Sequence, residues 1–476
     1  MNGNRRTENT DIREQENRKR NGGTVPPAAF LRENDAGAGG SWQAEERTGT
    51  GSGAAIGGDA GPGTGPEPHA GGGMPPERDP AFWERLKEEI RSAAPELGID
   101  KIGFTTADPF LELKDILYRH REAGRESGFE EPDIEKRVHP ELLFDRPRSI
   151  LSIAVAYPSK LHNPPRSEPG AYRGILSRSA WGKDYHHVLR DRLARLEAFI
   201  RNRVPDARLE SMVDTGALVD RAVAERAGIG WTGKNCAVIT PEWGSWVYLG
   251  EMITNLPFAP DTPVTEDCGD CTICIDACPT GALVGPGQLN SGSCVSFLTQ
   301  TKGLVPDEFR EKIGNRLYGC DTCQIVCPKN KGKHWSHHAD LAPDPEIVKP
   351  LLKPLLTLGN KEFKERFGSS AAAWRGKKPI QRNALLALGN FKDRSAVPII
   401  IETMRSDPRW EIRGTAAWAL GKIGGEEALQ ALRQAAEDET DERAAEEIAK
   451  ALVRLDGEAG EREDRSRASA HGEAAD

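Results

Sequence analysis

The sequence predicts an α+β protein made of three folded parts in a row. Strand-like and helical stretches alternate over 79–262, eight of the nine cysteines gather within 263–340, and a helical motif repeats over 350–456. A chain of 476 residues is too long for one ordinary domain, so we expect more than one hydrophobic core.

The two ends of the chain are polar. Residues 1–78 are rich in Gly, Pro, Ser and charge, and residues 457–476 are almost wholly polar or small. Because neither segment can bury enough apolar surface to offset the entropy cost of ordering, we expect a disordered N-terminal extension and a disordered C-terminal tail. The first amphipathic helix is expected at 80–94, with Leu86 and Ile90 on its apolar face.

Short apolar runs between turn residues mark the strands of the first part. Helical stretches at 184–202 and 216–228 lie among them. This alternation indicates an α+β domain, while the order of the strands in the sheet stays open. The expected strands are 99–107, 149–157, 209–214, 235–240 and 245–253.

A short apolar pattern recurs in the last part. The run ALLALG at 384–389 returns as AAWALG at 416–421, 32 residues later, and AKAL at 449–452 lies about one further period along. A period near this length is typical of HEAT-like helical pairs, whose apolar faces are covered only when neighbouring pairs stack. We therefore expect HEAT-like helical repeats over 350–456.

Charge and hydropathy narrow the class of protein. A formal net charge of -9 excludes a uniformly basic nucleic-acid binder, although a local basic face stays possible. No stretch approaches the ~20 apolar residues of a membrane span, and the N-terminus lacks the apolar run of a secretory signal. We expect a cytoplasmic protein with no membrane association, in a reducing compartment that suits clustered cysteines.

Eight cysteines form two copies of a metal-binding pattern. The first copy, C-x2-C-x2-C-x3-C-P, occupies 268–279, and the second is stretched over 294–328. Thiolates at this spacing let one loop wrap three corners of a 4Fe-4S cubane, while the fourth cysteine, followed by Pro, binds the other cluster. Two structural zinc sites are the alternative. The first cluster is thus assigned Cys268, Cys271, Cys274 and Cys327, and the second Cys278, Cys294, Cys320 and Cys323.

Several longer motifs carry a resemblance to a known family. They are SRSAWGKDYHHVL at 177–189, VDTGALVDRAVAERAGIGWTGKN at 213–235, WGSWVYLGEM at 243–252 and SFLTQTKG at 296–303. Together with the double cysteine set, they resemble epoxyqueuosine reductase over about 98–335. The resemblance implies a cobalamin-binding α/β domain, a ferredoxin-like double-cluster domain and, as in the longer members, a HEAT-like tail.

The resemblance implies the last step of queuosine synthesis. This step removes the epoxide oxygen of epoxyqueuosine at the wobble position of tRNA with a GUN anticodon, using cobalamin and two 4Fe-4S clusters. An external donor of the flavodoxin or ferredoxin type is expected to supply electrons. No GxGxxG fingerprint follows a strand that would offer a flavin or dinucleotide acceptor instead. A monomer is expected, because no self-complementary apolar face is evident.

Asp214, in the VDTG run after an expected strand, matches the proton donor of that family. An opened epoxide must be protonated, so a carboxylic acid is expected beside the cobalt. The alternative is an Asp that caps the following helix. The chain departs from the family pattern at Ala217, where the family has Pro, and at Asp220, where it often has Glu, which leaves the placement of the acid open.

Cobalamin is large and rich in amides, so its pocket should offer backbone groups and polar side chains. Each candidate alone would be an ordinary surface or turn residue, and Cys236 alone a small buried one. His186 and His187 are interpreted as helix-surface or substrate-side residues, because Leu189 replaces the Gly of the DxHxxG signature, so no His on cobalt is expected. By motif position the cobalamin candidates are Arg137, Ser177, Asp214, Lys234, Asn235, Cys236 and Ser293.

A tRNA substrate requires contacts to phosphates. Between Arg375 and Arg413 the chain has nine Lys or Arg against four Asp or Glu, an excess that could hold an anticodon stem. A solvated helix face is the alternative. Trp374 and Trp410 are candidates to stack on bases, with packing inside the repeats as the alternative for either. The expected tRNA contacts are Lys302, Lys377, Arg382 and Arg413.

Two other functions stay open at this point. A reductive dehalogenase-like cobalamin enzyme of a small molecule would carry a twin-arginine signal or a membrane segment, and neither is evident here. A pure electron-transfer protein with two clusters would leave the region 98–260 without a purpose.

Overall fold

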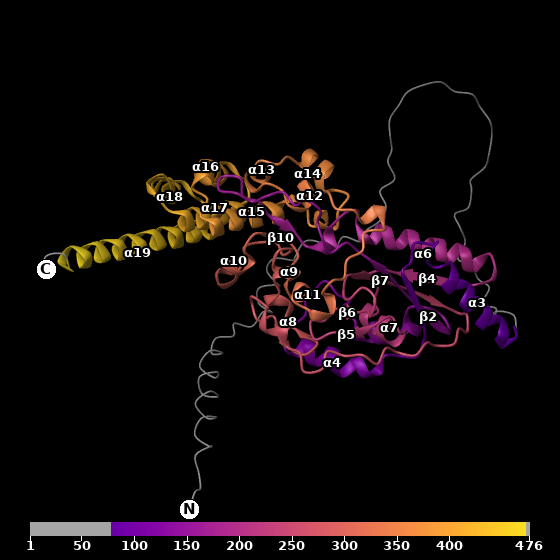
Figure 1. The fold of residues 1–476 in the computed structure, drawn as a ribbon. Coiled ribbons are helices and arrows are strands. Elements are labelled where there is room, and N and C mark those ends of the chain that lie inside the picture. Colours follow the sequence, from indigo (N-terminus) through magenta and orange to yellow (C-terminus); the bar gives the residue numbers. More distant parts are fainter. Residues whose placement is uncertain (1–77, 473–476) are drawn as a thin grey trace, which may run out of the picture. The chain divides into compact units, whose positions relative to one another are not determined.

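The computed structural model describes residues 78–472 (Figure 1). The extension expected over 1–78 therefore lies outside the described residues, except for Arg78. Within the described part, no helix is long and apolar enough to cross a membrane.

A four-stranded antiparallel sheet forms the centre of the first part, in the order β1-β2-β7-β4. Strand β2 is buried along its whole length, which explains why its sequence is a continuous apolar run rather than an alternating one. Four of the five expected strands are confirmed in this sheet. The strands are β1 (Lys101–Thr106), β2 (Ser149–Ala156), β7 (Val247–Thr254) and β4 (Leu209–Met212).

The fifth expected strand, at 235–240, contributes only a short pair outside the sheet. There β6 (Val238–Ile239) lies antiparallel to β5 (Trp231–Thr232). Asn235 and Cys236 instead form a tight turn, with Cys236 in the left-handed region at φ +65°. A residue with that backbone angle cannot continue a strand.

Helices cover both faces of the sheet (Figure 1). On one face, α3 (Pro80–Ala93) and α6 (Tyr185–Arg201) pack on strand residues such as Met252. The Asp79 carboxylate caps α3, and that of Asp184 caps α6. Both helices agree with the sequence analysis.

The opposite face is covered by α7 (Asp220–Arg226), whose Val223 packs on Ile150 and Ile253. This helix begins four residues later than expected from the sequence. Residues 213–219 form a turn instead of the first part of the helix, and Asp214 lies in this turn.

Short elements complete the part of the chain around the cysteines. Strand β10 joins it to the first part by pairing in parallel with β3. Helices α8 and α11, each inside a cysteine motif, lie against one another. The bounds are α4 (Leu111–Glu122), α5 (Ile134–Val138), β3 (Ile175–Leu176), α8 (Ile273–Asp276), β8 (Leu283–Gly285), β9 (Gln288–Leu289), α9 (Val295–Leu298), α10 (Asp307–Ile313), β10 (Arg316–Tyr318) and α11 (Thr322–Ile325).

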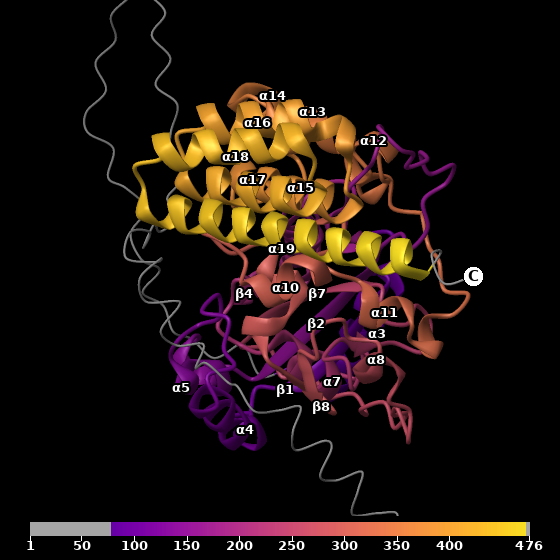
Figure 2. The same cartoon turned by 90° about the vertical axis from the view of Figure 1, so that its left-hand side faces the viewer.

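The last part is a stack of helical pairs, and Figure 2 shows α15, α17 and α19 side by side. The recurring Gly is what lets them approach. A Cβ on Gly389 would lie 2.8 Å from the Trp418 ring, and one on Gly421 would lie 2.9 Å from Cβ of Ala451. The helices are α12 (Pro345–Val348), α13 (Leu352–Leu356), α14 (Asn360–Phe367), α15 (Lys377–Phe391), α16 (Val397–Ser406), α17 (Trp410–Ile423), α18 (Glu426–Asp438) and α19 (Glu442–Gly472).

The C-terminal end differs from the expectation. We expected a disordered tail over 457–476, whereas α19 continues as helix to Gly472. The composition of this segment, with several Ala, Glu and Arg, is compatible with helix even where it lacks an apolar face.

Candidate active site

Asp214 stands in a strained turn directly after β4. Its φ of +53° lies in the left-handed region, which costs energy for a residue other than Gly and is often found at functional sites. The side chain is 59% exposed, yet one carboxylate oxygen is held from two directions. Tyr185 donates its hydroxyl to Oδ2 over 2.5 Å, and Nε2 of His186 lies 3.4 Å from the same oxygen.

His186 bridges two carboxylates. Its Nδ1 lies 2.8 Å from Oδ1 of Asp184, and its Nε2 faces Asp214. Burial opposes a charge on the ring, but the hydrogen bonds and charges of Asp184 and Asp214 outweigh it and raise the pKa of His186 to about 9. The hydrogen bond from His186 is also the main reason that the pKa of Asp214 is lowered. At neutral pH the mobile proton therefore sits on His186, and Asp214 is ionised.

Aromatic rings fix this group in place. The Tyr185 ring stacks on Tyr248 at 4.8 Å and 9°, and it also stacks on the His186 ring at 4.1 Å. Burial raises the pKa of Tyr185, with the charge of Asp214 adding to it, so its hydroxyl remains a donor. Tyr185 was not among the site residues expected from the sequence, although the run DYHH at 184–187 holds both partners of Asp214.

The first cysteine quartet surrounds one cavity. Cys327, from the second motif, lines this cavity of about 110 Å³ together with all three early cysteines of the first motif. In the ferredoxin pattern, the fourth cysteine of one motif likewise binds the cluster held by the first three cysteines of the other motif. Lys234 and Asn235, expected at cobalamin, line the same cavity, and the full lining is Lys234, Asn235, Ile239, Cys268, Cys271, Cys274, Cys327, Pro328 and Lys329.

The other four cysteines form a second group. Burial raises the pKa of Cys294 to about 11, and nearby Cys320 and Cys278 add to the shift. The same neighbours act on Cys323, whose pKa burial also raises. A thiolate in this place needs a metal to compensate its desolvation.

The spacing of the sulfur atoms distinguishes cubanes from mononuclear zinc. Sulfurs bound to one tetrahedral zinc would lie about 3.8 Å apart, given a Zn–S bond of about 2.3 Å. Over 78–472, the single group of three or more metal-binding side chains whose ligand atoms all lie within 4.8 Å of one another contains no cysteine. Both quartets are thus too widely spaced for a single zinc ion.

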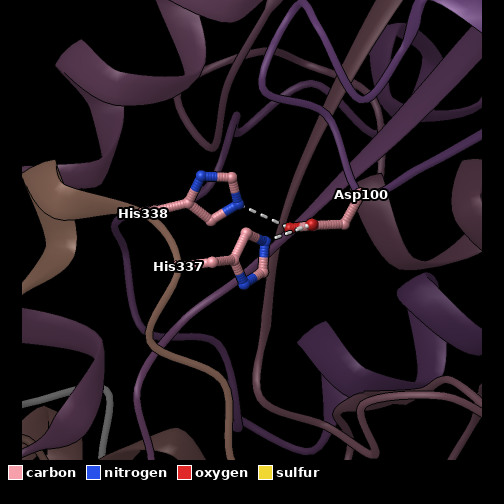
Figure 3. Close-up of side chains that lie close together, drawn as sticks. All are labelled: Asp100, His337 and His338. Carbon is pink, nitrogen blue, oxygen red and sulfur yellow. Dashed lines mark hydrogen bonds and ion pairs between the residues drawn. The ribbon is translucent and has the colours of Figure 1, made fainter.

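That one compact group is Asp100, His337 and His338 (Figure 3). Nε2 of His337 lies 2.6 Å from Oδ1 of Asp100, and Nε2 of His338 lies 2.7 Å from Oδ2. The amide of Ala156 also donates to Oδ2, at 2.7 Å. The two imidazole nitrogens and the Asp100 carboxylate thus bond to one another without a metal ion. The group fastens the segment that contains His337 and His338 to the start of β1.

The cobalamin candidates lie in two places. Ser177 is buried against the backbone of Gly319, the residue before Cys320, and Ser293 directly precedes Cys294. Both thus border the second quartet. Asn235 stands beside the first quartet, where its Nδ2 is buried and has no hydrogen-bond partner among the described residues.

Two further cobalamin candidates, Cys236 and Arg137, contact charged neighbours. Arg221 donates to the carbonyl of Cys236 over 2.9 Å, which fixes the turn. Arg137 lies 3.9 Å from Glu126, and burial lowers its pKa. An unpaired amide donor at Asn235 suits a ligand rich in amides, as cobalamin is.

The structure corrects the expected tRNA contacts. Arg382 is 1% exposed and donates to the carbonyls of Leu298, Thr301 and Gly303, so it is wrong as a contact to tRNA. It instead fastens the SFLTQTKG loop to α15. Arg413 is held by the Glu439 carboxylate through two hydrogen bonds of 2.7 Å, which neutralises its charge.

Of the other basic residues, Lys377 donates to the carbonyl of Leu358 over 2.9 Å, and Lys302 is half-buried. The exposed basic side chains in this region are Lys392, Arg394 and Arg405. Any phosphate contact by this region is therefore expected from those three residues rather than from Arg382.

An exposed aromatic pair stands near Asp214. Phe129 and Trp374 are 45% and 43% exposed, and their rings meet edge to face at 5.2 Å. Arg375 lies over both rings. The indole N–H of Trp374 donates to Oε1 of Gln300 over 2.9 Å. Tyr318 lies between this pair and the site, because burial raises its pKa and the charges of Asp184 and Asp214 raise it further. Trp410, by contrast, is half-buried under Arg443.

A double cysteine set beside an activated carboxylate defines an iron-sulfur oxidoreductase, and the chain matches the 4Fe-4S double cluster binding domain over 267–330. It also matches the family models of epoxyqueuosine reductase QueG over 137–215 and of HEAT repeats over 373–453. It is 61% identical to an epoxyqueuosine reductase of Bacillus subtilis over 371 residues, which are 78% of this chain and 96% of that protein. The chain belongs to the epoxyqueuosine reductase family.

Two solved structures are similar as well. One is an epoxyqueuosine reductase with an epoxyqueuosine-modified stem loop of tyrosine tRNA, at a TM-score of 0.77 and 61% identity, covering 79% of this chain and 100% of that one. The other is the Bacillus subtilis enzyme with its catalytic aspartate loop swung out of the active site, at a TM-score of 0.77 and 60% identity, covering 78% and 100%.

Proposed function

We propose that this chain reduces epoxyqueuosine to queuosine at the wobble position of tRNA with a GUN anticodon. The observation that carries the proposal is the strained Asp214, bonded by Tyr185 and His186, in a chain of this family that also holds two cysteine quartets. Removing the epoxide oxygen as water consumes two electrons and two protons. The residues around Asp214 account for a proton supply.

Asp214 is the proposed proton donor. Its Oδ2 ends a chain that starts at Asp184 and runs through the imidazolium of His186, and the Asp214 side chain as a whole is 59% exposed. A proton passed from Nε2 of His186 to Oδ2 of Asp214 would place an acid at the open side of the site. Tyr185 keeps that oxygen oriented throughout.

The proposed cofactors are two 4Fe-4S clusters and cobalamin. Cys268, Cys271, Cys274 and Cys327 would hold one cluster, and Cys278, Cys294, Cys320 and Cys323 the other. Ser177, Asn235 and Ser293 are the best-supported contacts to cobalamin. When bound, the clusters relay single electrons and cobalamin provides a strongly nucleophilic reduced cobalt.

The tRNA substrate is expected to present an unstacked wobble base, since the reacting group must leave the anticodon stack to reach a buried centre. The exposed pair Phe129 and Trp374, with Arg375 above it, would stack on a flipped base or on its neighbour. We further propose a monomer in the cytoplasm that receives electrons from an external flavodoxin or ferredoxin.

Nucleoside analysis tests the proposal. In a strain that lacks the gene, mass spectrometry of tRNA nucleosides should find epoxyqueuosine in place of queuosine. Re-expression of the wild-type chain should restore queuosine, whereas Asp214→Ala should not. Normal queuosine in the strain without the gene would refute the function. The absorption spectrum of the anaerobically purified protein should show a cobalamin band together with iron-sulfur bands. If the cobalamin band is absent, cobalamin is not a cofactor of this protein.

A further inference from the structure

Cys320, a ligand assigned to the second cluster, begins the run CDTC at 320–323. Its sulfur lies 3.3 Å from the hydroxyl oxygen of Thr322, two residues further along the chain. Thr322 is the first residue of α11, and it is half-buried. In a pair of a hydroxyl and a thiol either group can donate, so the direction of this hydrogen bond depends on the other contact of the Thr322 side chain.

Arg316, the first residue of β10, makes that contact. Its Nη2 donates to Oγ1 of Thr322 over 2.9 Å. Its Nη1 donates to the carbonyl of Ile313, also over 2.9 Å, which holds the guanidinium in place. Because a guanidinium can only donate, Oγ1 of Thr322 accepts from Arg316, and the hydroxyl proton points to the sulfur of Cys320.

A cysteine that binds a cluster is a thiolate, so it accepts this hydrogen bond. Hydrogen bonds to the sulfurs are among the factors that set the reduction potential of an iron-sulfur cluster. When the cluster gains an electron its thiolates become more negative, and a hydrogen bond to a more negative acceptor is stronger. The hydroxyl of Thr322 therefore stabilises the reduced state more than the oxidised state, which raises the potential.

The two quartets differ in this respect. In the second quartet, Oγ1 of Thr280 lies 3.7 Å from the sulfur of Cys278, again two residues further along the chain. The residues two places after the cysteines of the first quartet have no hydroxyl, and they are Asp270, Ile273, Asp276 and Lys329. Hydroxyl donors at this offset thus act on the second cluster and not on the first.

We propose that Arg316 and Thr322 raise the reduction potential of the second 4Fe-4S cluster, and so shift an electron shared by the two clusters toward the second one. Ser177 and Ser293 border that quartet, so the electron is held on the side of these cobalamin candidates. Arg316 is a positioning residue, because it acts through Thr322. The step adds one electron from the external donor and moves no proton. The inference rests on the cluster ligands of the proposed function.

A redox titration of the anaerobically purified full-length protein, followed by electron paramagnetic resonance, tests the proposal. Thr322→Val keeps the shape of the side chain but removes the hydroxyl. It should make reduction of one cluster about tenfold less favourable, a fall of about 59 mV in a one-electron potential, and leave the other cluster unchanged. Thr322→Ser keeps the hydroxyl and should titrate near the wild type.

A second background assigns the shift to a cluster. In Cys271→Ser, where the second cluster alone is expected to remain, adding Thr322→Val should produce the same fall. Thr272→Val is the matched control, because the Thr272 hydroxyl bonds the carboxylate of Asp276 over 2.8 Å rather than a sulfur. Both potentials should stay at their wild-type values in this control. Iron analysis of each variant shows that the clusters are present.

Double variants test the part of Arg316. Arg316→Gln should lower the same potential, and its combination with Thr322→Val should fall short of the sum of the two single shifts, because both act through one hydroxyl. Shifts that add would remove Arg316 from the proposal.

Three outcomes would overturn the role of Thr322. They are an unchanged potential in both Thr322→Val and Thr322→Ala, an equal fall in Thr322→Ser, or a fall confined to the first cluster. A wild-type protein without two clusters would overturn the inference together with the proposed cofactors, whereas two clusters with unchanged potentials would overturn the inference alone.

Discussion

Nε2 of His186 lies 3.4 Å from Oδ2 of Asp214, so a ring that holds a proton faces a carboxylate that lacks one. Because the substrate reduction needs protons, this pair stores one next to the exposed acid. In the proposed mechanism His186 would retain the proton and Asp214 would present it to the substrate.

Replacing Asp214 by Asn should lower the rate of epoxyqueuosine reduction by roughly 10²- to 10⁴-fold, the usual contribution of a general acid. Iron content and tRNA affinity should stay close to those of the wild type, because the side chain is exposed and binds no cluster. Single-turnover rates on a stem loop measure this. Asp206→Asn, an exposed change in the loop before β4, is the control. A loss of less than tenfold would argue for another donor.

Activity should decline as pH rises through about 9, because His186 then loses its proton. The folded-state pKa is raised above the ordinary 6.5, so the stability that this ion pair contributes is full below about pH 6.5 and is lost as pH rises through about 9. His186→Gln should be slow at every pH and lack this decline. A pH–rate profile from 6 to 10 on both proteins, about the useful range for a His, checks it. An unchanged decline in His186→Gln would assign the titration elsewhere.

Iron analysis of paired cysteine variants should reveal which ligands share a cluster. Cys271→Ser and Cys327→Ser should each remove about half of the iron, and the double variant no more than either alone. Cys271→Ser combined with Cys320→Ser should remove nearly all of it. If instead the double variant loses the sum of the iron lost by the two single variants, Cys271 and Cys327 bind different clusters. The assignment of Cys327 to the first cluster would then be wrong.

Arg382→Met should weaken folding rather than tRNA binding. It leaves buried carbonyls of the 298–303 loop without a donor, at a cost of about 1–3 kcal/mol for each unpaired group. Thermal unfolding should shift down, while the salt dependence of tRNA binding stays as in the wild type.

Arg394→Gln supplies the contrast, since this side chain is exposed. It should leave thermal unfolding unchanged and reduce the salt slope by about one unit if it contacts a phosphate. A reduced slope in Arg382→Met at unchanged stability would restore that residue as a contact.

Much of this protein was determined by local sequence. The spacing of the eight cysteines predicts two clusters, and the structure brings Cys327 to the first three cysteines as that spacing requires. The 32-residue period predicts stacked helices, and Gly389 and Gly421 show why the period holds, because a side chain at either would collide with the next helix. These features depend on residues close in the chain or on a repeat, so the sequence can show them.

Only the tertiary structure decided which side chains meet across long distances. Arg382 counted as a basic surface residue until packing placed it under the 298–303 loop, more than seventy residues away. Glu251 belongs to an ordinary strand pattern, and its carboxyl is 1% exposed only because α7 packs on β7. Charge and burial depend on what surrounds a side chain, and those surroundings come from segments that the linear pattern does not bring together.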